Sequence, residues 1–218
     1  MSLETSGLRG FDPGSARGGC ATENRVYPKL KRAVDVVVVA AASPAVLIII
    51  LLASAAIYLL ESGPIFFVQD RVGKGRRIFR MIKLRTMVNE QLGEERATSK
   101  SDTRVTWLGR FLRQSHIDEL PQVLNILMGD MTLVGPRPEQ PGLVAQYRDR
   151  LPNYDLRHTV TPGLTGWAQV NFGYAADLSE TAQKLDYDVE YVKYYGPKMD
   201  LLIVLKTFRI FCDPRYVR

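Results

Sequence analysis

The longest apolar stretch of the chain runs from Val36 to Leu60, 25 residues without a charged side chain. As an α-helix rising about 1.5 Å per residue it would extend roughly 37 Å, enough to cross a hydrocarbon core of about 30 Å. It begins too far from Met1, and is too long, to be the apolar region of a cleaved signal peptide. The pattern therefore predicts a membrane segment.

Ser43 and Pro44 interrupt this segment. A proline inside a helix removes a hydrogen bond and costs about 3 kcal/mol unless the helix bends. Basic residues flank the run on both sides, so the positive-inside rule puts both flanks in the cytoplasm. These residues are Arg25, Lys29, Lys31 and Arg32 before the run and Arg71, Lys74, Arg76, Arg77 and Arg80 after it. We therefore favour a re-entrant helix-break-helix hinged at Ser43-Pro44, with a Pro-kinked transmembrane helix as the alternative.

Shorter patterns predict the elements that follow. In residues 63–87, apolar and aromatic residues on both sides of a Gly-Lys-Gly turn predict a β-hairpin. The polar stretch 89–103 is typical of a loop. Residues 103–115 form a short basic amphipathic helix, which suits either a core-facing position or the headgroup plane of a membrane. The apolar C-terminal stretch 199–211 is too short to span a bilayer and fits the same interfacial position.

Together these elements predict a mainly α protein with a small β-hairpin, of the α+β class. Residues 1–28 contain five glycines and few large apolar side chains, so they cannot offset the entropy of ordering and predict a loose tail. We expect a re-entrant membrane hairpin at 29–61. A cytosolic or interfacial globular domain, surrounded by interfacial amphipathic helices, is expected at 62–218.

Composition narrows the partners of this domain. Apolar residues make up 46% of the 218, which excludes global disorder, and the net charge of +6 favours an anionic partner. Nucleic acid, a phosphate-bearing substrate and an anionic membrane face all remain open at this point. Cys20 and Cys212 lie near opposite ends without metal-ligand spacing, so a zinc site or disulfide framework is not indicated and a reducing cytosol fits best.

The candidate chemistry lies in "HIDELPQ", residues 116–122. Helical spacing of the apolar residues, with a proline that suits only a first turn, predicts a helix beginning near Asp118. By position alone Asp118 is an N-cap and Glu119 a first-turn acid. Arg113 upstream, and Arg137 between two prolines downstream, make a phosphate site the alternative. A carboxylate beside such arginines can bind Mg²⁺ or attack phosphorus itself.

Several motifs together resemble one known family. "KRAVDV" before the apolar run, "FVQDRVGKGRRIFRMIKLRTM", "LGRFLRQSHIDELPQVLNILMGDMTLVGPRP" and "LRHTVTPGLTGWAQVN" occur in the order found in small monotopic polyprenol-phosphate phosphoglycosyl transferases, the bacterial sugar transferases. The resemblance covers residues 29 to 211. It implies transfer of a sugar 1-phosphate from a UDP-sugar to undecaprenyl phosphate, with release of UMP, on the cytoplasmic face of the bacterial inner membrane. This reaction is the first membrane step of exopolysaccharide or other surface-glycan synthesis.

The resemblance also implies residue roles. Asp118 is the nucleophile and binds Mg²⁺, and Glu119 completes the dyad. The substrate phosphates and the nucleotide fall to Arg85, Arg113, Pro136, Arg137, Pro138 and His158, although His158 equally suits a buried structural role. The membrane segment is anchored by Lys31, Arg32 and Asp35 and broken at Ser43 and Pro44. The implied partners are the UDP-sugar, undecaprenyl phosphate, the lipid bilayer and downstream glycosyltransferases, with a homodimer left open and nucleic acid not expected.

Two departures from the family pattern limit what carries over. After "GWAQVN" the chain continues "FGYAADLSETAQKLDYDVEYVKYYG" rather than Gly-Arg-Asn, so the sugar stays open. His116 stands where a small or apolar residue is more usual. Larger members carry transmembrane helices ahead of this domain, and we expect a stand-alone small enzyme, with a truncated large one as the alternative.

Two other functions compete. One is a basic membrane-attached module that binds nucleic acid or lipid, with the two acids as a mere helix cap, although no nucleic-acid-binding motif is visible. The other is a Mg²⁺-dependent lipid phosphatase or pyrophosphatase, which would release no UMP.

Overall fold

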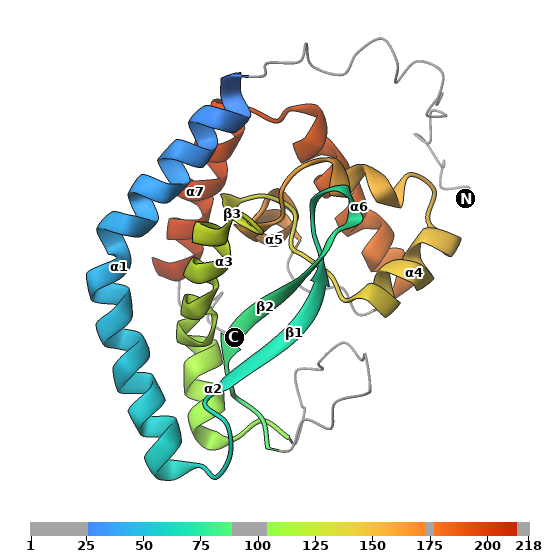
Figure 1. Cartoon of the computed structure of the whole chain (residues 1–218). Coiled ribbons are helices and arrows are strands. Elements are labelled where there is room, and N and C mark those ends of the chain that lie inside the picture. Colours follow the sequence, from blue (N-terminus) through green and yellow to red (C-terminus); the bar gives the residue numbers. More distant parts are fainter. Residues whose placement is uncertain (1–25, 89–103, 173–176, 213–218) are drawn as a thin grey trace, which may run out of the picture.

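The computed structural model describes residues 26–88, 104–172 and 177–212 (Figure 1). The predicted loop 89–103 and most of the predicted tail lie outside the described residues. The elements confirm the mainly α, α+β class: two two-stranded sheets lie among helices. In chain order they are α1 (Val26–Leu60), β1 (Phe66–Val72), η2 (Lys74–Arg76), β2 (Ile78–Leu84), α2 (Trp107–Gln114), η3 (Ile117–Gln122), α3 (Val123–Met128), β3 (Thr132–Val134), α4 (Pro141–Arg150), η4 (Tyr154–Thr159), β4 (Gly163–Thr165), α5 (Trp167–Asn171), α6 (Leu178–Lys193) and α7 (Pro197–Cys212).

The helix α1 runs for 35 residues without interruption, so the predicted break at Ser43-Pro44 is wrong as secondary structure. Pro44 has no N–H for the carbonyl of Ala40, but the Ser43 hydroxyl donates to that carbonyl at 2.8 Å. The missing hydrogen bond is thus replaced locally, and the helix bows instead of breaking (Figure 1). Among the residues that the structure describes, α1 is the one helix long and apolar enough to cross a membrane.

Both ends of α1 pack on the globular domain. Near its start, Lys31 forms an ion pair with Asp200 of α7, and Asp35 accepts a hydrogen bond from Thr132 of β3. Near its end, Ala53 and Ile57 pack in a buried cluster with apolar residues of β2 and α2. No residue from 40 to 52 is buried. The middle of α1 is therefore an exposed apolar stretch held at both ends.

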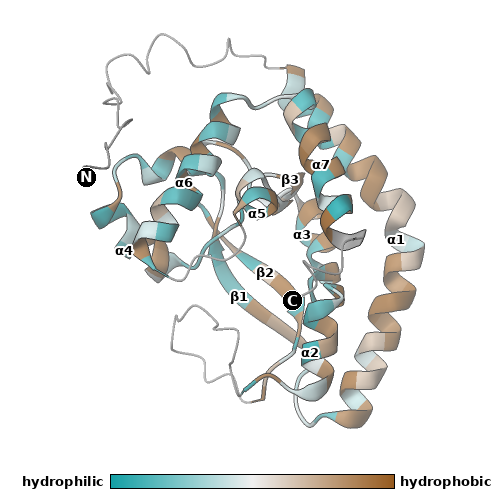
Figure 2. Ribbon diagram, turned by 180° about the vertical axis from the view of Figure 1, so that it is seen from behind, coloured by the Kyte–Doolittle hydropathy of each residue, from teal (hydrophilic) through white to brown (hydrophobic). Residues whose placement is uncertain are grey.

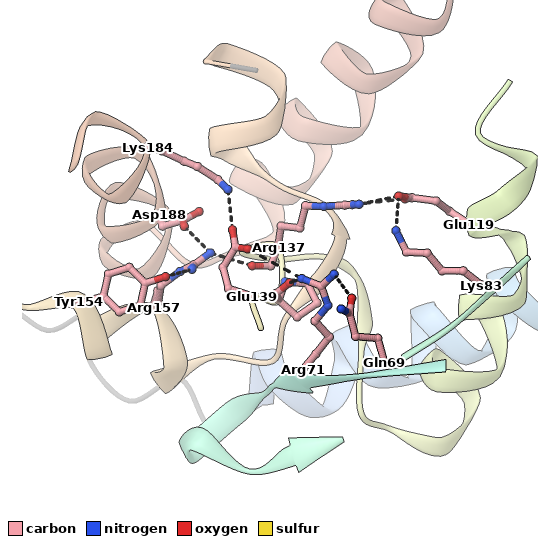
Figure 3. Close-up of polar contacts among 11 residues, drawn as sticks. Gln69, Arg71, Lys83, Glu119, Arg137, Glu139, Tyr154, Arg157, Lys184 and Asp188 are labelled. Atoms are coloured by element: carbon pink, nitrogen blue, oxygen red, sulfur yellow. Dashed lines mark hydrogen bonds and ion pairs between the residues drawn. The ribbon is translucent and has the colours of Figure 1, made fainter. Parts of the chain in front are cut away.

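The predicted hairpin is confirmed. β1 and β2 pair antiparallel, from Phe66 opposite Leu84 to Val72 opposite Ile78. Gly75 in the connecting turn has φ +62°, a conformation that glycine adopts without steric cost. The hairpin carries Lys83 to Glu119 and Arg71 to Glu139 (Figure 3).

A second, parallel pair was not predicted. β3 and β4 align Thr132 with Gly163 and Val134 with Thr165. The backbones approach so closely that a Cβ on Gly163 would lie 2.0 Å from the nitrogen of Gly135. This contact holds the segment after β3, residues 135–139, which we call the GPRPE loop, against the start of β4.

Candidate active site

The two adjacent acids lie on η3, beside β2. The Asn125 side chain, fully buried at the start of α3, accepts a hydrogen bond from the backbone nitrogen of Ile82 and donates to the carbonyl of Arg80. These two bonds attach the η3–α3 segment to β2. In a regular α-helix beginning at Ile117, the backbone N–H of residue 121 would donate to the carbonyl of Ile117. Pro121 has no N–H to donate, and the segment is a 3₁₀ helix. The helix start was thus predicted to within a residue, but its type was not.

Asp118 is buried, with 7% of its surface exposed. It does not cap the helix, because His116 occupies the N-cap position in a left-handed conformation with φ +56°. Burial, reinforced by the neighbouring Glu119 charge, raises the pKa of Asp118 to about 6. Its side chain is therefore mostly an ionised carboxylate at pH 7.5, held in an environment that penalises its charge.

Glu119 is a fixed anion that binds two basic side chains, Lys83 and Arg137. Burial lowers the pKa of Lys83, and the charge of Glu119 opposes that effect. Its Oε1 accepts hydrogen bonds from Lys83 Nζ at 3.0 Å and Arg137 Nη2 at 2.5 Å, and its Oε2 accepts one from Arg137 Nη1 at 3.3 Å (Figure 3). Burial alone would raise the pKa of Glu119, but Arg137 and Lys83 outweigh it and hold that pKa well below its usual value. Glu119 therefore orients the lysine and the arginine, which come from opposite sides of the site.

Three basic side chains act electrostatically on the Asp118 carboxylate. Lys83, Arg113 and Arg137 each lie close enough to lower its pKa, against the larger opposing effect of burial. Arg113 is oriented by a 2.7 Å hydrogen bond from its Nε to the hydroxyl of Thr86. Arg137 thus binds Glu119 directly, and Arg113 and Lys83 act on the charge of Asp118.

Lys83 is the site residue that sequence reasoning missed. The signal for it is slight: it stands in β2 between Ile82 and Leu84, so a charge interrupts an otherwise apolar end of a strand. Its partner Glu119 is 36 residues further along the chain. Local pattern alone carries no information on such a pair.

The GPRPE loop places Arg137 between two buried prolines. Pro136, Pro138 and His158 line one small recess beside it. Burial, assisted by the charge of Arg157, lowers the pKa of His158 to about 4, so its imidazole is neutral at pH 7. A neutral imidazole cannot neutralise phosphate charge, although its ring nitrogens can still form hydrogen bonds.

The other predicted site residues lie elsewhere. Arg85 donates to the carbonyl of Ser62 at 2.7 Å and lies 3.6 Å from Glu61, at the end of α1. It is not among the charges with the largest effect on the pKa of Asp118. Arg32 donates to the last carbonyls of α3, including that of Leu127 at 2.7 Å. With Lys31 and Asp35, it fastens α1 to the globular domain.

Asp118 and Glu119 are suited to binding Mg²⁺ only if a substrate supplies further oxygen ligands. No cluster of three or more His, Cys, Asp and Glu side chains that could bind a metal occurs in the described part of the chain. Both oxygens of Glu119 already bind cations, which leaves Asp118 as the carboxylate available to a metal. Because Mg²⁺ commonly takes one or two carboxylates plus phosphate oxygens and water, Asp118 beside a diphosphate suits it.

Comparison with known proteins identifies the family. The family model described as bacterial sugar transferase matches residues 26–214. The chain belongs to this family. The match covers α1, the dyad and the GPRPE loop, so the site described above lies entirely within the family's own domain.

Named relatives agree with this assignment. The chain is 45% identical over 193 residues to the UDP-N-acetylgalactosamine-undecaprenyl-phosphate N-acetylgalactosaminephosphotransferase of Aeromonas hydrophila, a match that covers 88% of this chain and 45% of that protein. It is 36% identical over 183 residues to the UDP-glucose:undecaprenyl-phosphate glucose-1-phosphate transferase of Escherichia coli K12, covering 82% of this chain and 39% of that one. The exopolysaccharide production protein PSS of Rhizobium leguminosarum is 34% identical, with 82% and 92% covered. The chain therefore spans less than half the length of the first two.

Proposed function

We propose that the chain transfers a sugar 1-phosphate from a UDP-sugar to undecaprenyl phosphate, with release of UMP, and so initiates a surface glycan. The buried carboxylate of Asp118, on which the charges of Lys83, Arg113 and Arg137 act, carries this proposal. The names of the family relatives supply the substrate classes, a UDP-sugar and undecaprenyl phosphate. UDP-N-acetylgalactosamine and UDP-glucose are the first donors to test.

The reaction proceeds in two displacements. An oxygen of the Asp118 carboxylate attacks the sugar-bound phosphorus, the bond from that phosphorus to the UMP oxygen breaks, and UMP leaves with the electron pair. A phosphate oxygen of undecaprenyl phosphate then attacks the same phosphorus. The acyl phosphate bond breaks and the Asp118 carboxylate is regenerated, with the phosphosugar now on the lipid.

Charge neutralisation is the main requirement of both steps. A carboxylate approaching a dianionic diphosphate is repelled, so positive charge near the phosphates must offset the repulsion. Arg113 and Arg137 supply fixed guanidinium groups, and Glu119 keeps Arg137 and Lys83 oriented. Mg²⁺ bound at Asp118 would supply further charge to the phosphate oxygens.

The membrane arrangement is part of the proposal. Exposed apolar residues lie along the middle of α1 and also on α2, α3 and α7, and Figure 2 colours hydrophobic residues of the ribbon brown. They include Trp107, Phe111, Leu124, Leu127, Met128, Leu201, Leu202, Leu205 and Phe208. Because both ends of α1 pack on the same domain, we propose that α1 enters one leaflet and returns, with the domain on the cytoplasmic face. The site then lies at headgroup height, where the lipid phosphate is found.

A labelling experiment tests this topology. In a chain with Cys20 and Cys212 replaced by serine, a single cysteine is introduced at Lys29 or at Ser62, exposed positions at the two ends of α1. We expect a membrane-impermeant maleimide to label both positions in inverted membrane vesicles, and neither in right-side-out vesicles. Labelling from opposite sides would restore the transmembrane span.

The activity is tested by UMP release. A panel of UDP-sugars, beginning with the N-acetylgalactosamine and glucose donors, is incubated with the protein in nanodiscs, with Mg²⁺ and with or without undecaprenyl phosphate. We expect catalytic UMP release from at least one donor only when the lipid is present, and at most one equivalent without it. Release of inorganic phosphate from a lipid diphosphate, with no UMP from any sugar, would favour the phosphatase instead.

A further inference from the structure

The backbone carbonyls of the GPRPE loop accept hydrogen bonds from three separate segments of the chain. The carbonyl of Pro136 accepts from Gly163, and that of Glu139 accepts from Val72, both at 2.9 Å. Between them, the carbonyl of Arg137 accepts a 2.7 Å hydrogen bond from the guanidinium of Arg157. This last bond holds the peptide that carries the Arg137 side chain toward Glu119.

Arg157 is itself fixed by a buried network. Its guanidinium forms an ion pair at 2.8 Å with Asp188 of α6 and donates to the hydroxyl of Tyr154 at 2.7 Å (Figure 3). The side chains of Arg157 and Asp188 are 4% and 2% exposed. A buried guanidinium needs a counter-charge and an oriented partner for its fork of donors. Asp188 supplies both, so the direction of the bond to the loop depends on it.

A second contact joins the same face of α6 to the loop. Lys184, one helical turn before Asp188, donates to Glu139 at 2.7 Å. Lys184 and Asp188 lie four residues apart, so their side chains lie on one face of α6. That face lies behind the loop, on the side away from the dyad, and Figure 3 shows the chain of contacts from α6 through Arg157 to Arg137 and Glu119.

We infer that α6 is a positioning element for the active site, in which Asp188 orients Arg157 and Arg157 fixes the backbone of Arg137. This inference rests on the proposed function. Asp188 and Arg157 touch no reacting group and act through Arg137. The helix α6, Leu178–Lys193, thereby acquires a role in placing the arginine that faces the dyad.

A double-mutant cycle tests the inference, with UMP release from UDP-N-acetylgalactosamine or UDP-glucose as the rate. We expect Arg137→Ala to lower kcat about 100- to 1,000-fold. Asp188→Asn should lower it about 10- to 100-fold by misplacing Arg137. In the Arg137→Ala background, Asp188→Asn should change the rate less than about twofold, because residues that act as a unit are not additive. Arg157→Lys keeps the charge but loses the fork of donors, and should behave like Asp188→Asn.

The cycle separates positioning from folding. If Asp188→Asn merely lowers the folded fraction, it lowers the rate by the same factor in both backgrounds, and that result would overturn the inference. Asp186→Asn, an exposed aspartate on the same helix, is the matched control and should leave the rate unchanged.

Hydrogen exchange provides a readout that needs no turnover. Asp188→Asn should speed exchange of the amides of Val72, Gly135 and Gly163, which are bonded to or within the loop, and Asp186→Asn should not. Unchanged exchange would reject the inference whatever the activity. Faster exchange with no UMP release by the wild type would support the positioning network and reject the proposed function alone.

Discussion

Replacing Asp118 by asparagine should abolish sugar-phosphate transfer. The amide keeps the shape of the carboxylate but cannot attack phosphorus, so we expect kcat to fall by about 10⁴-fold or more. The covalent phosphosugar intermediate should disappear as well. Mass spectrometry of acid-quenched protein incubated with donor alone should show the added phosphosugar in the wild type and none in Asp118→Asn.

The same substitution should stabilise the protein. Asp118 binds its proton more tightly in the folded state, with a pKa of about 6, than in the unfolded chain, where the pKa is near 3.8. Its ionisation above pH 6 therefore costs folding free energy, on the order of 3 kcal/mol, and asparagine avoids that cost. We expect a higher Tm for Asp118→Asn at pH 8, with the difference shrinking as the pH falls through 6.

These two results together exclude a structural explanation. A variant that loses activity because it unfolds would show a lower Tm, whereas a nucleophile in an unfavourable environment should show loss of activity with gain of stability. Asp149→Asn, an exposed aspartate on α4, should change neither quantity. Turnover by Asp118→Asn at the wild-type rate would show that the acids only begin a helix.

Local patterns predicted the elements whose causes are local. The hairpin followed from a glycine turn between apolar runs, and the helix at Trp107–Gln114 followed from its apolar spacing. The structure adds its cap, the Thr106 side chain, which accepts a hydrogen bond from the backbone N–H of Gly109. The break at Ser43-Pro44 failed for a local reason too. Proline removes one donor, but the preceding serine hydroxyl supplies another to the same carbonyl, so the chain did not need to break.

What the sequence could not predict was the pairing of distant groups. Three-residue strands such as Thr132–Val134 and Gly163–Thr165 carry too little pattern to predict a parallel pair. The partners of Asp200 show the same limit: the Lys31 ammonium lies 169 residues from it, and the Tyr27 hydroxyl lies 173 residues from it. Family resemblance supplied the dyad and its arginines, while the contacts that orient them required the structure.

Replacing Lys83 by methionine should also lower the rate of sugar-phosphate transfer strongly. The ammonium is one of the three cations near Asp118 and forms one of the ion pairs that fix Glu119, at 3.0 Å. Methionine keeps the apolar stem and removes the charge, so the repulsion between Asp118 and the diphosphate is less well offset. We expect kcat to fall about 100- to 1,000-fold in the UMP-release assay.

The pH profile of Lys83→Met carries a separate expectation. Lys83 lowers the pKa of Asp118, so its removal should raise that pKa further above its usual value. Because the nucleophile must be ionised, the acidic limb of kcat/KM should move to higher pH, and the rate at pH 6 should suffer more than the rate at pH 8. Lys83→Arg restores the positive charge. It should recover part of the activity and return the acidic limb of kcat/KM to its wild-type pH.

Two comparisons decide whether Lys83 acts on the reaction. Lys198→Met removes the same charge from an exposed position on α7 and should leave both the rate and the limb unchanged. A Lys83→Met protein that keeps the wild-type rate would mean that Arg113 and Arg137 suffice, and that the lysine serves only to neutralise buried Glu119. A lower rate with an unmoved acidic limb would mean that Lys83 contacts the diphosphate rather than setting the charge state of Asp118.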